Sequence, residues 1–437
     1  MSARILIEVG IGETRGALIE DGRLTALAVE RGSGFDPGAD IVLGRVGAHL
    51  ARMKAHEVAL PGDVAALCPT RDKRRLDEGR SLIVQIDRAA HGRKGPRVTT
   101  DAALAGRFLV LRPGKTGVGL ARGTKDAPGL TKRWAHLAKA DGILLRPAIL
   151  DAEADWVEAE ADRLRAHWHA IEAKARETKA PALLAADLSP LLRLLRDAPA
   201  RCRVEIDDAT EAARLRGVIP PDLAAGIAVH RDASAIFALD DVDAQIAEAL
   251  ETRIERPDGL ALYLEPTEAL TAIDVDVGGT SDLAAACRRA ADEIARQLRL
   301  RRIGGQIVVD FPRLGTEDAR RKLAEHLRAR LAGDPEPVEF GGPTRLGLIE
   351  LVRRRSGPTL AELLGTLRGG FVASPATEVR EALRHALTEA RARPGRPVPM
   401  AVSPGAKRRL EADDAPLLDE FRRRTGVALD LKEAGGG

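Results

Sequence analysis

Three aspartates carry the clearest chemical signal in this sequence. Asp274 and Asp276 alternate with apolar residues in the run 273–277, so a strand there would place both carboxylates on the same face. Gly278 and Gly279 follow directly, and glycines let a ligand or another backbone approach closely. Asp310 ends a second apolar run. The sequence therefore predicts carboxylates at the ends of two neighbouring strands.

Carboxylate oxygens from two strands are the ligands that Mg²⁺ prefers, because this ion takes one or two carboxylates and bridges to substrate phosphate. A metal ion in such a site can activate a water molecule and stabilise charge that grows on the phosphate. The residues alone leave an alternative open, since acidic residues also end strands as helix caps or solvated turn residues. An EF-hand is excluded, because the twelfth position of a loop starting at Asp274 is Ala285 rather than glutamate.

The elements around these aspartates alternate between strand and helix patterns. Asp282 is a predicted N-cap, and Gly304-Gly305 is the predicted stop of the same helix. The expected elements are strands 260–264 and 269–276, a helix 282–302, a buried strand 306–310, a helix 316–332 and a strand 346–352. This order is typical of an α/β layer with carboxylates at its strand ends.

The rest of the chain predicts several smaller units. Short β-rich runs at 5–9, 15–20 and 24–30 predict a β-meander. Broken apolar runs from Asp40 to about Val110 predict a small barrel, with 84–86 and 108–111 as its clearest strands. The segment 151–179 predicts a helix with one apolar face that belongs to the core, formed by Val157, Leu164, Trp168, Ile171 and Ala175.

Composition narrows the class of protein. The 437 residues carry a formal charge of only +3 and 3% aromatics, so a nucleic-acid site would have to be a local group of arginines and lysines. The three cysteines are scattered, which predicts reduced thiols rather than disulfides. We find neither a signal peptide nor a long apolar stretch, so we expect a cytoplasmic protein without a membrane partner.

Three blocks of sequence, in this order, resemble motifs of the ribonuclease E/G family. The first is Thr267-Glu268-Ala269-Leu270-Thr271-Ala272-Ile273-Asp274-Val275-Asp276. The second is Ala290-Ala291-Asp292-Glu293-Ile294-Ala295-Arg296-Gln297-Leu298-Arg299-Leu300-Arg301, and the third is Gly304-Gly305-Gln306-Ile307-Val308-Val309-Asp310-Phe311. The similarity extends from the first residues to about Leu360, and the tail beyond it is a weaker match.

The resemblance implies an α+β multidomain fold. The implied parts are an RNase H-like subdomain (1–39 and 193–257), an OB-type RNA-binding barrel inserted in it (40–103), a 5′-sensor-like region (104–192), a DNase I-like catalytic subdomain (258–355), and a linker with a small C-terminal α/β domain (356–437).

The resemblance also implies an activity: Mg²⁺-dependent endonucleolytic cleavage of single-stranded RNA by an activated water, leaving a 5′-phosphate and a 3′-hydroxyl. Carried over to this chain, Asp274 and Asp310 would hold the metal. Asp276 stands where the family has an asparagine that contacts the scissile phosphate. The residues expected to contact RNA are Lys94, Arg97, Arg146, Arg296 and Arg299.

Other departures from the family pattern limit what can be carried over. The family's 5′-sensor has an Arg-Thr pair, whereas this chain has Arg146-Pro147. The family's zinc-binding Cys-Pro-x-Cys motif should follow Leu360, but 356–437 contains no cysteine, so we expect no zinc and, in any homodimer, contacts made by packing. The alternative reading is an RNA-binding relative with weak or no nuclease activity, because Asp276 and the altered sensor both differ from the family.

Overall fold

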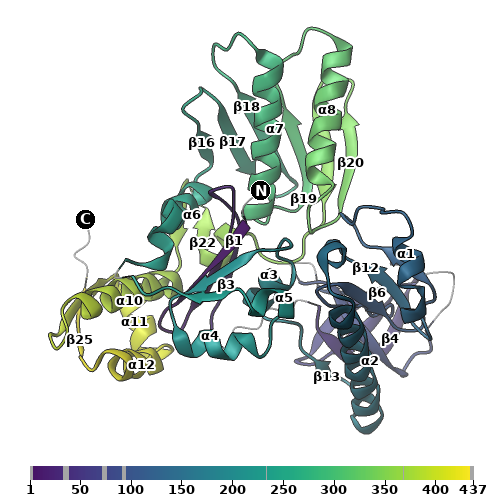
Figure 1. The fold of residues 1–437 in the computed structure, drawn as a ribbon, viewed down its shortest axis with the longest axis horizontal. Coiled ribbons are helices and arrows are strands. Elements are labelled where there is room, and N and C mark those ends of the chain that lie inside the picture. Colours follow the sequence, from purple (N-terminus) through teal and green to yellow (C-terminus); the bar gives the residue numbers. More distant parts are fainter. Residues whose placement is uncertain are drawn as a thin grey trace.

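The computed structural model describes residues 3–32, 39–70, 76–90, 95–232, 234–367 and 369–433. It is a mixed α+β protein built from several sheets. In Figure 1 one lobe, formed by strands β16 to β21 with helices α7 and α8, stands apart from the rest of the molecule. The other two ends of the molecule are the helical tail around α10 and the region around β4 and α2.

The separate lobe holds a six-stranded sheet covered on one face by two helices. The sheet order is β16-β17-β18-β19-β21-β20, and β18 and β19 run parallel. Its elements are β16 (Arg253–Glu255), β17 (Ala261–Pro266), β18 (Leu270–Asp276), α7 (Leu283–Leu300), β19 (Gly305–Asp310), α8 (Glu317–Leu331), β20 (Val338–Pro343) and β21 (Ile349–Arg353). Inward-facing Ile273 and Val309 pack against Ile294 of α7 and Leu327 of α8 in one core.

The predicted alternation of strands and helices in this lobe is confirmed. The Asp282 side chain accepts a hydrogen bond from the Ala285 amide at 2.8 Å, so Asp282 is the N-cap of α7 as expected. One detail was wrong, because β19 is not buried on both faces. Val308 is partly exposed and Gln306 is exposed, which leaves the face opposite α7 and α8 open.

A five-stranded sheet at the centre of the molecule has the order β15-β14-β1-β2-β3. The predicted meander is present as β1 (Ala3–Val9), β2 (Thr14–Glu20) and β3 (Arg23–Glu30). Two later strands, β14 (Arg203–Ile206) and β15 (Ile227–Val229), extend it in parallel with β1. Short helices accompany this sheet, namely α3 (Pro190–Arg196), α4 (Ala209–Arg216), α5 (Pro221–Ala224), α6 (Val242–Leu250) and α9 (Leu360–Leu364).

Five strands close into a barrel, consistent with the expected OB-type fold. They are β4 (Ile41–Leu50), β5 (Ala55–Leu60), β6 (Val64–Pro69), β7 (Ser81–Arg88) and β8 (Arg97–Thr99), and pairing of β4 with β7 closes the ring. The placement of 108–111 in this barrel was wrong. Leu109 pairs with Leu145 in a separate four-stranded sheet, because β10 (Leu109–Arg112) finds its partner in β12 (Gly142–Leu145).

The separate four-stranded sheet also contains β9 (Leu104–Ala105) and β11 (Val118–Leu120), with the short helix α1 (Leu130–Arg133) after it. The long helix α2 (Ala154–Glu177) covers it and confirms the predicted apolar face. Val157, Leu164 and Ile171 are buried in this core, and Trp168 packs against it. The strand β13 (Ala182–Ala185) then returns to pair with β4 of the barrel.

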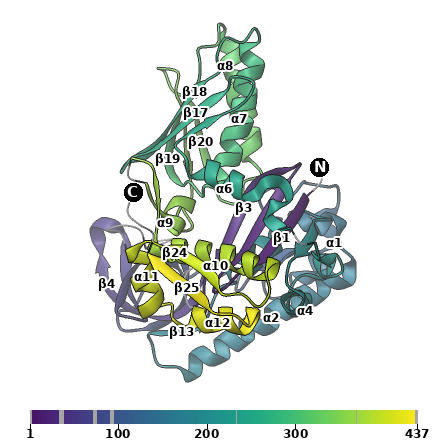
Figure 2. The same cartoon turned by 90° about the vertical axis from the view of Figure 1, so that its left-hand side faces the viewer.

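The C-terminal segment forms a small α/β unit that packs against the central sheet (Figure 2). Its elements are β22 (Gly365–Leu367), β23 (Phe371–Ala373), α10 (Pro375–Ala392), β24 (Val398–Val402), α11 (Pro404–Ala412), α12 (Pro416–Thr425) and β25 (Leu429–Glu433). Ile11, from the turn between β1 and β2, is 1% exposed inside the core of this unit. The tail and the first two strands therefore share one hydrophobic core.

Candidate active site

The carboxylates of Asp274 and Asp310 lie side by side at the end of two hydrogen-bonded strands. In the parallel pairing of β18 with β19, Asp274 is the direct register partner of Asp310. Both side chains are exposed on the open face of the sheet, opposite the face that α7 and α8 cover. The backbone pairing of the two strands fixes their separation.

Asp276 lies on the same face, two residues beyond Asp274. Ile273, Val275 and Val277 alternate with the aspartates and are buried, so the predicted same-face arrangement is confirmed. The Asp276 Oδ1 accepts a hydrogen bond from the Gly278 amide at 2.9 Å. Gly278 has a φ of +57°, a left-handed conformation that glycine adopts without strain. This turn holds the Asp276 carboxylate against its own backbone.

The donor set at this strand edge fits a hard divalent cation. Neither Asp274 nor Asp310 has a hydrogen bond or an ion pair to any residue that the structure describes. Among the described residues, no group of three or more His, Cys, Asp and Glu side chains is arranged to hold a metal ion. Two exposed, unpaired carboxylates match an ion that keeps most of its water, as Mg²⁺ does.

One residue beside the aspartates was missed by the sequence analysis. Tyr263 of β17 is the register partner of Asp274, and Arg253 of β16 is in turn the partner of Tyr263. The Arg253 guanidinium lies 5.4 Å from the centre of the Tyr263 ring. Alternation along β17 would have indicated an outward-facing Tyr263, but only the register between strands places it next to Asp274.

One of the predicted RNA-contacting residues, Arg97, lies in the barrel strand β8. Lys94 lies outside the described residues. Arg97 donates from Nε to Asp87 Oδ2 at 2.7 Å, and Arg354 lies 2.6 Å from the other oxygen of the same carboxylate. Asp87 therefore joins the barrel to the segment that follows β21, and the Arg97 side chain is 40% exposed beside it.

Arg146 takes part in a partly buried ion-pair group. Its guanidinium lies 2.5 Å from Asp197, which Arg196 also binds at 2.8 Å. Burial alone would raise the pKa of Asp197, but the hydrogen bonds and charges of Arg196 and Arg146 lower it to about 2. Asp197 is therefore ionised throughout the neutral range, and Arg146 has a structural partner.

Arg296 and Arg299 face the central sheet rather than the open face of the lobe. Arg296 is 8% exposed and lies 2.7 Å from Glu293, with a further hydrogen bond to the Leu24 carbonyl at 2.6 Å. Arg299 pairs with Glu20 of β2 at 3.2 Å. These contacts attach α7 to the central sheet, so the two arginines are not included in the RNA-binding surface proposed below.

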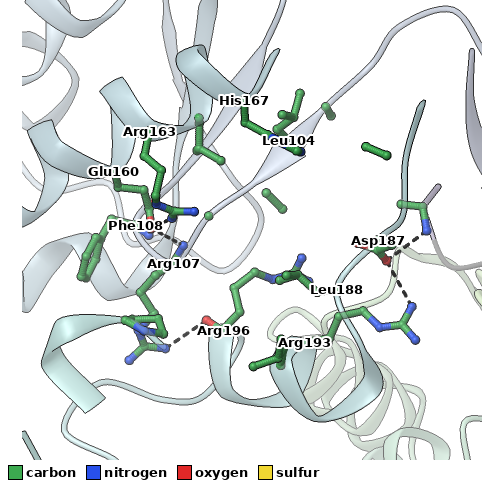
Figure 3. Close-up of a pocket in the computed structure, with 18 of the residues that line it drawn as sticks. Leu104, Arg107, Phe108, Glu160, Arg163, His167, Asp187, Leu188, Arg193 and Arg196 are labelled. Atoms are coloured by element: carbon green, nitrogen blue, oxygen red, sulfur yellow. Dashed lines mark hydrogen bonds and ion pairs between the residues drawn. The ribbon is translucent and has the colours of Figure 1, made fainter. Parts of the chain in front are cut away.

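A cavity of about 900 Å³ lies between the barrel, α2 and α3. Figure 3 shows Arg163 and His167 of α2 on one side of it and Arg193 and Arg196 of α3 on the other. Most of its cations are paired: Arg193 with Asp187, and buried Arg107 with Asp222. Arg146, which the sequence predicts to contact RNA, does not line this cavity.

Comparison with known proteins agrees with the motifs of the aspartate site. A model of the "Ribonuclease E/G family" matches residues 103–356. Ribonuclease E of Nostoc sp. (strain PCC 7120) is 36% identical over 310 residues, which cover 65% of this chain and 44% of that protein. Ribonuclease G of Escherichia coli (strain K12) is 28% identical over 401 residues, covering 83% of this chain and 82% of that protein.

Ribonuclease E of Synechocystis sp. (strain PCC 6803) is 33% identical over 311 residues, which cover 46% of that protein. The chain therefore spans less than half the length of these two ribonuclease E relatives. The matched region of the family model contains both Asp274 and Asp310. Among the described helices, none combines the length and the apolar character needed to cross a membrane.

Proposed function

This chain belongs to the ribonuclease E/G family, and we propose that it is an endoribonuclease that cleaves single-stranded RNA with Mg²⁺ as its cofactor. The observation that carries this proposal is the direct pairing of Asp274 with Asp310, both exposed and free of partners among the described residues. In this proposal the lobe of β16–β21 is the DNase I-like subdomain, and the central sheet is the RNase H-like one. The three free, buried cysteines fit a reducing cytoplasm.

The roles of the residues follow from their positions. Asp274 and Asp310 hold the metal ion at the strand edge, and Asp276 lies beside the place of the scissile phosphate. A magnesium ion held by these residues would supply an activated water and offset charge on the phosphate, and the expected products carry a 5′-phosphate and a 3′-hydroxyl. The open sheet face leaves room for a chain that is not paired with a second strand.

The direct test is incubation of the purified protein with a fluorescent single-stranded RNA, with and without Mg²⁺. We expect internal cleavage only when Mg²⁺ is present, and no cleavage of the same sequence in a duplex. Failure to cleave, combined with tight RNA binding, would favour the second candidate function, an RNA-binding relative with weak or no nuclease activity. Asp276, which adds a third negative charge where the family has a neutral side chain, is the observation behind that alternative.

Replacing Asp276 with asparagine should tighten RNA binding and raise the cleavage rate by about threefold to tenfold. The change removes a charge that repels the incoming phosphate, a gain of about 0.7–1.4 kcal/mol. The asparagine side chain keeps an oxygen that can accept the hydrogen bond from the Gly278 amide, so the turn is retained. Affinity and rate are measured with the same fluorescent RNA. Weaker Mg²⁺ affinity in this variant would instead identify Asp276 as a third metal ligand.

The cleavage rate should depend little on whether the RNA carries a 5′-monophosphate or a 5′-hydroxyl. Pro147 offers a phosphate neither a side-chain donor nor a backbone N–H, and Arg146 is already paired with Asp197. Rates for the two forms of one RNA should agree within about threefold, or about 0.7 kcal/mol. A preference of about tenfold for the monophosphate would mean that other residues form a 5′-sensor.

A further inference from the structure

We propose that a cavity beside Asp310 holds the phosphodiester backbone of the RNA next to the cleaved bond. This inference rests on the proposed function, because it assigns a subsite to that same active site. The cavity has a volume of about 570 Å³ and is lined by the segment after β19, by the first turns of α8 and by the hairpin turn between β20 and β21. Asp310 itself forms part of its wall.

The hairpin turn reaches the aspartates because of the strand register. Ile349 of β21 pairs with Val309, so the turn before Ile349 lies next to Asp310. The turn is closed by two backbone hydrogen bonds, from the Thr344 amide to the Leu348 carbonyl at 2.7 Å and from the Gly347 amide to the Thr344 carbonyl at 3.0 Å. The cavity wall is therefore built on paired backbone.

Positive charge dominates this cavity. Arg313, Arg320 and Arg345 line it, are exposed, and form no ion pair or side-chain hydrogen bond with any described residue. A fourth arginine, Arg321, is held by Asp318 at 2.5 Å and by Glu325 at 2.9 Å. The carboxylates in the lining are Asp310 and Glu317, and Asp310 would be neutralised by a bound cation. Three unpaired guanidinium groups are suited to phosphate oxygens.

Two further side chains suit a nucleoside rather than a simple anion. Leu346, at the tip of the hairpin turn, is 81% exposed, which is the largest exposed fraction among the large hydrophobic residues of the described chain. Thr344 Oγ1 is buried in the cavity wall without a hydrogen-bond partner. An apolar surface for a base or ribose and an unused hydroxyl therefore lie beside the arginines.

The position of the cavity argues for RNA and against an acidic protein partner. The unpaired arginines surround the strand edge where the phosphate to be cleaved must lie, and the neighbouring phosphates of the same chain then fall within their reach. Phosphate contacts of this kind position the substrate without reading its sequence.

The experiment measures the affinity of a fluorescent single-stranded RNA over a range of salt concentrations. All variants are made in the Asp274→Asn background, so that the RNA stays intact. The double variant Arg320→Ala/Arg345→Ala should bind about tenfold or more weakly. The slope of log affinity against log salt should fall by about 0.7 for each lost phosphate contact. Arg320→Lys/Arg345→Lys, which keeps the charges, should recover most of that slope.

Arg328→Ala is the matched control, because Arg328 is an exposed arginine of the same helix that does not line the cavity. It should change affinity by less than about twofold. Equal losses in Arg328→Ala and in the double variant, or an unchanged salt slope in the double variant, would overturn the subsite. Arginine-dependent binding of a fluorescent poly-glutamate, without binding of the RNA, by the Asp274→Asn protein would identify an acidic protein partner instead.

The outcome is separable from that of the proposed function. Cleavage by the unmodified protein together with normal RNA binding by the double variant would reject the subsite alone. Arginine-dependent RNA binding without any cleavage by the unmodified protein would reject the nuclease activity and keep the subsite.

Discussion

Replacing Asp274 with asparagine should lower Mg²⁺-dependent cleavage by at least about 100-fold, which corresponds to about 2.7 kcal/mol of transition-state stabilisation. The change removes one of the two carboxylates that are proposed to hold the metal ion. RNA affinity should stay within about threefold of that of the unmodified protein, because no phosphate-binding cation is lost. Rates and affinities are measured with the same fluorescent single-stranded RNA. Asp310→Asn should have the same two effects, since Asp310 is the register partner of Asp274.

Glu265→Gln provides the control for these variants. Glu265 is an exposed carboxylate on β17, and its register partner, Ala272, lies two residues before Asp274. Glu265→Gln removes one negative charge near the site, as Asp274→Asn does, but leaves both proposed metal ligands in place. The cleavage rate should therefore change by less than about twofold. Full activity in Asp274→Asn or in Asp310→Asn would refute the site assignment. A comparable loss in Glu265→Gln would show that the rate follows the overall charge of the face.

The second large effect concerns stability. Replacing Glu293 with glutamine should lower the free energy of unfolding by about 3–5 kcal/mol, because the buried Arg296 then keeps only the more distant carboxylate of Glu248, 3.5 Å away. The Glu293 side chain is 3% exposed. Its carboxylate oxygens lie 2.5 Å from a guanidinium nitrogen of Arg23, 2.9 Å from one of Arg256 and 2.7 Å from one of Arg296. It joins α7 to both β3 and the end of β16. Equilibrium urea denaturation measures the change.

The same carboxylate predicts a pH dependence. Burial would raise its pKa, but the hydrogen bond and charge of Arg296, with Gln297 and Arg23, lower the pKa of Glu293 from 4.5 to about 2. A folded pKa below the unfolded value stabilises the protein fully above pH 4.5 and loses that stabilisation as the pH falls towards 2. Glu293→Gln should remove this part of the acid dependence.

Glu325→Gln is the comparison for both measurements, since the exposed Glu325 pairs with Arg321 within α8. Such surface pairs contribute about 0.3–0.5 kcal/mol. If Glu293→Gln lowered the free energy of unfolding no more than Glu325→Gln does, the ion pairs of Glu293 would not be what holds the lobe to the central sheet.

The same-face arrangement of Asp274 and Asp276 could be predicted from local pattern alone. Alternation placed Asp274 and Asp276 on one face, and a capping aspartate with paired glycines gave the limits of α7. The sequence predicted that the two strands would end near each other. It did not predict that Asp274 is the register partner of Asp310, because register depends on both strands together. The family resemblance supplied the activity but not these contacts.

Long-range partners could not be predicted. A helical pattern gives Arg296 and Arg299 a common face, but it does not say that this face meets Leu24 and Glu20, far away in the sequence. The strand at Leu109 was assigned to the barrel because nothing local excludes it, and only its pairing with Leu145 decides otherwise. The arginines of the cavity beside Asp310 come from the segment after β19, from α8 and from the turn after β20, and the fold alone brings them together.

The burial of Ile11 within the C-terminal unit has a consequence for biogenesis. Val379, Leu383 and Phe421, which share its core, leave the ribosome long after the turn that carries Ile11. At about 5–20 residues per second, roughly 20 to 80 seconds pass between the synthesis of that turn and the synthesis of Phe421. During synthesis the nascent chain therefore exposes Ile11 beside strands β1 and β2 until the C-terminal unit folds. Exposed apolar surface of this kind is what chaperones bind.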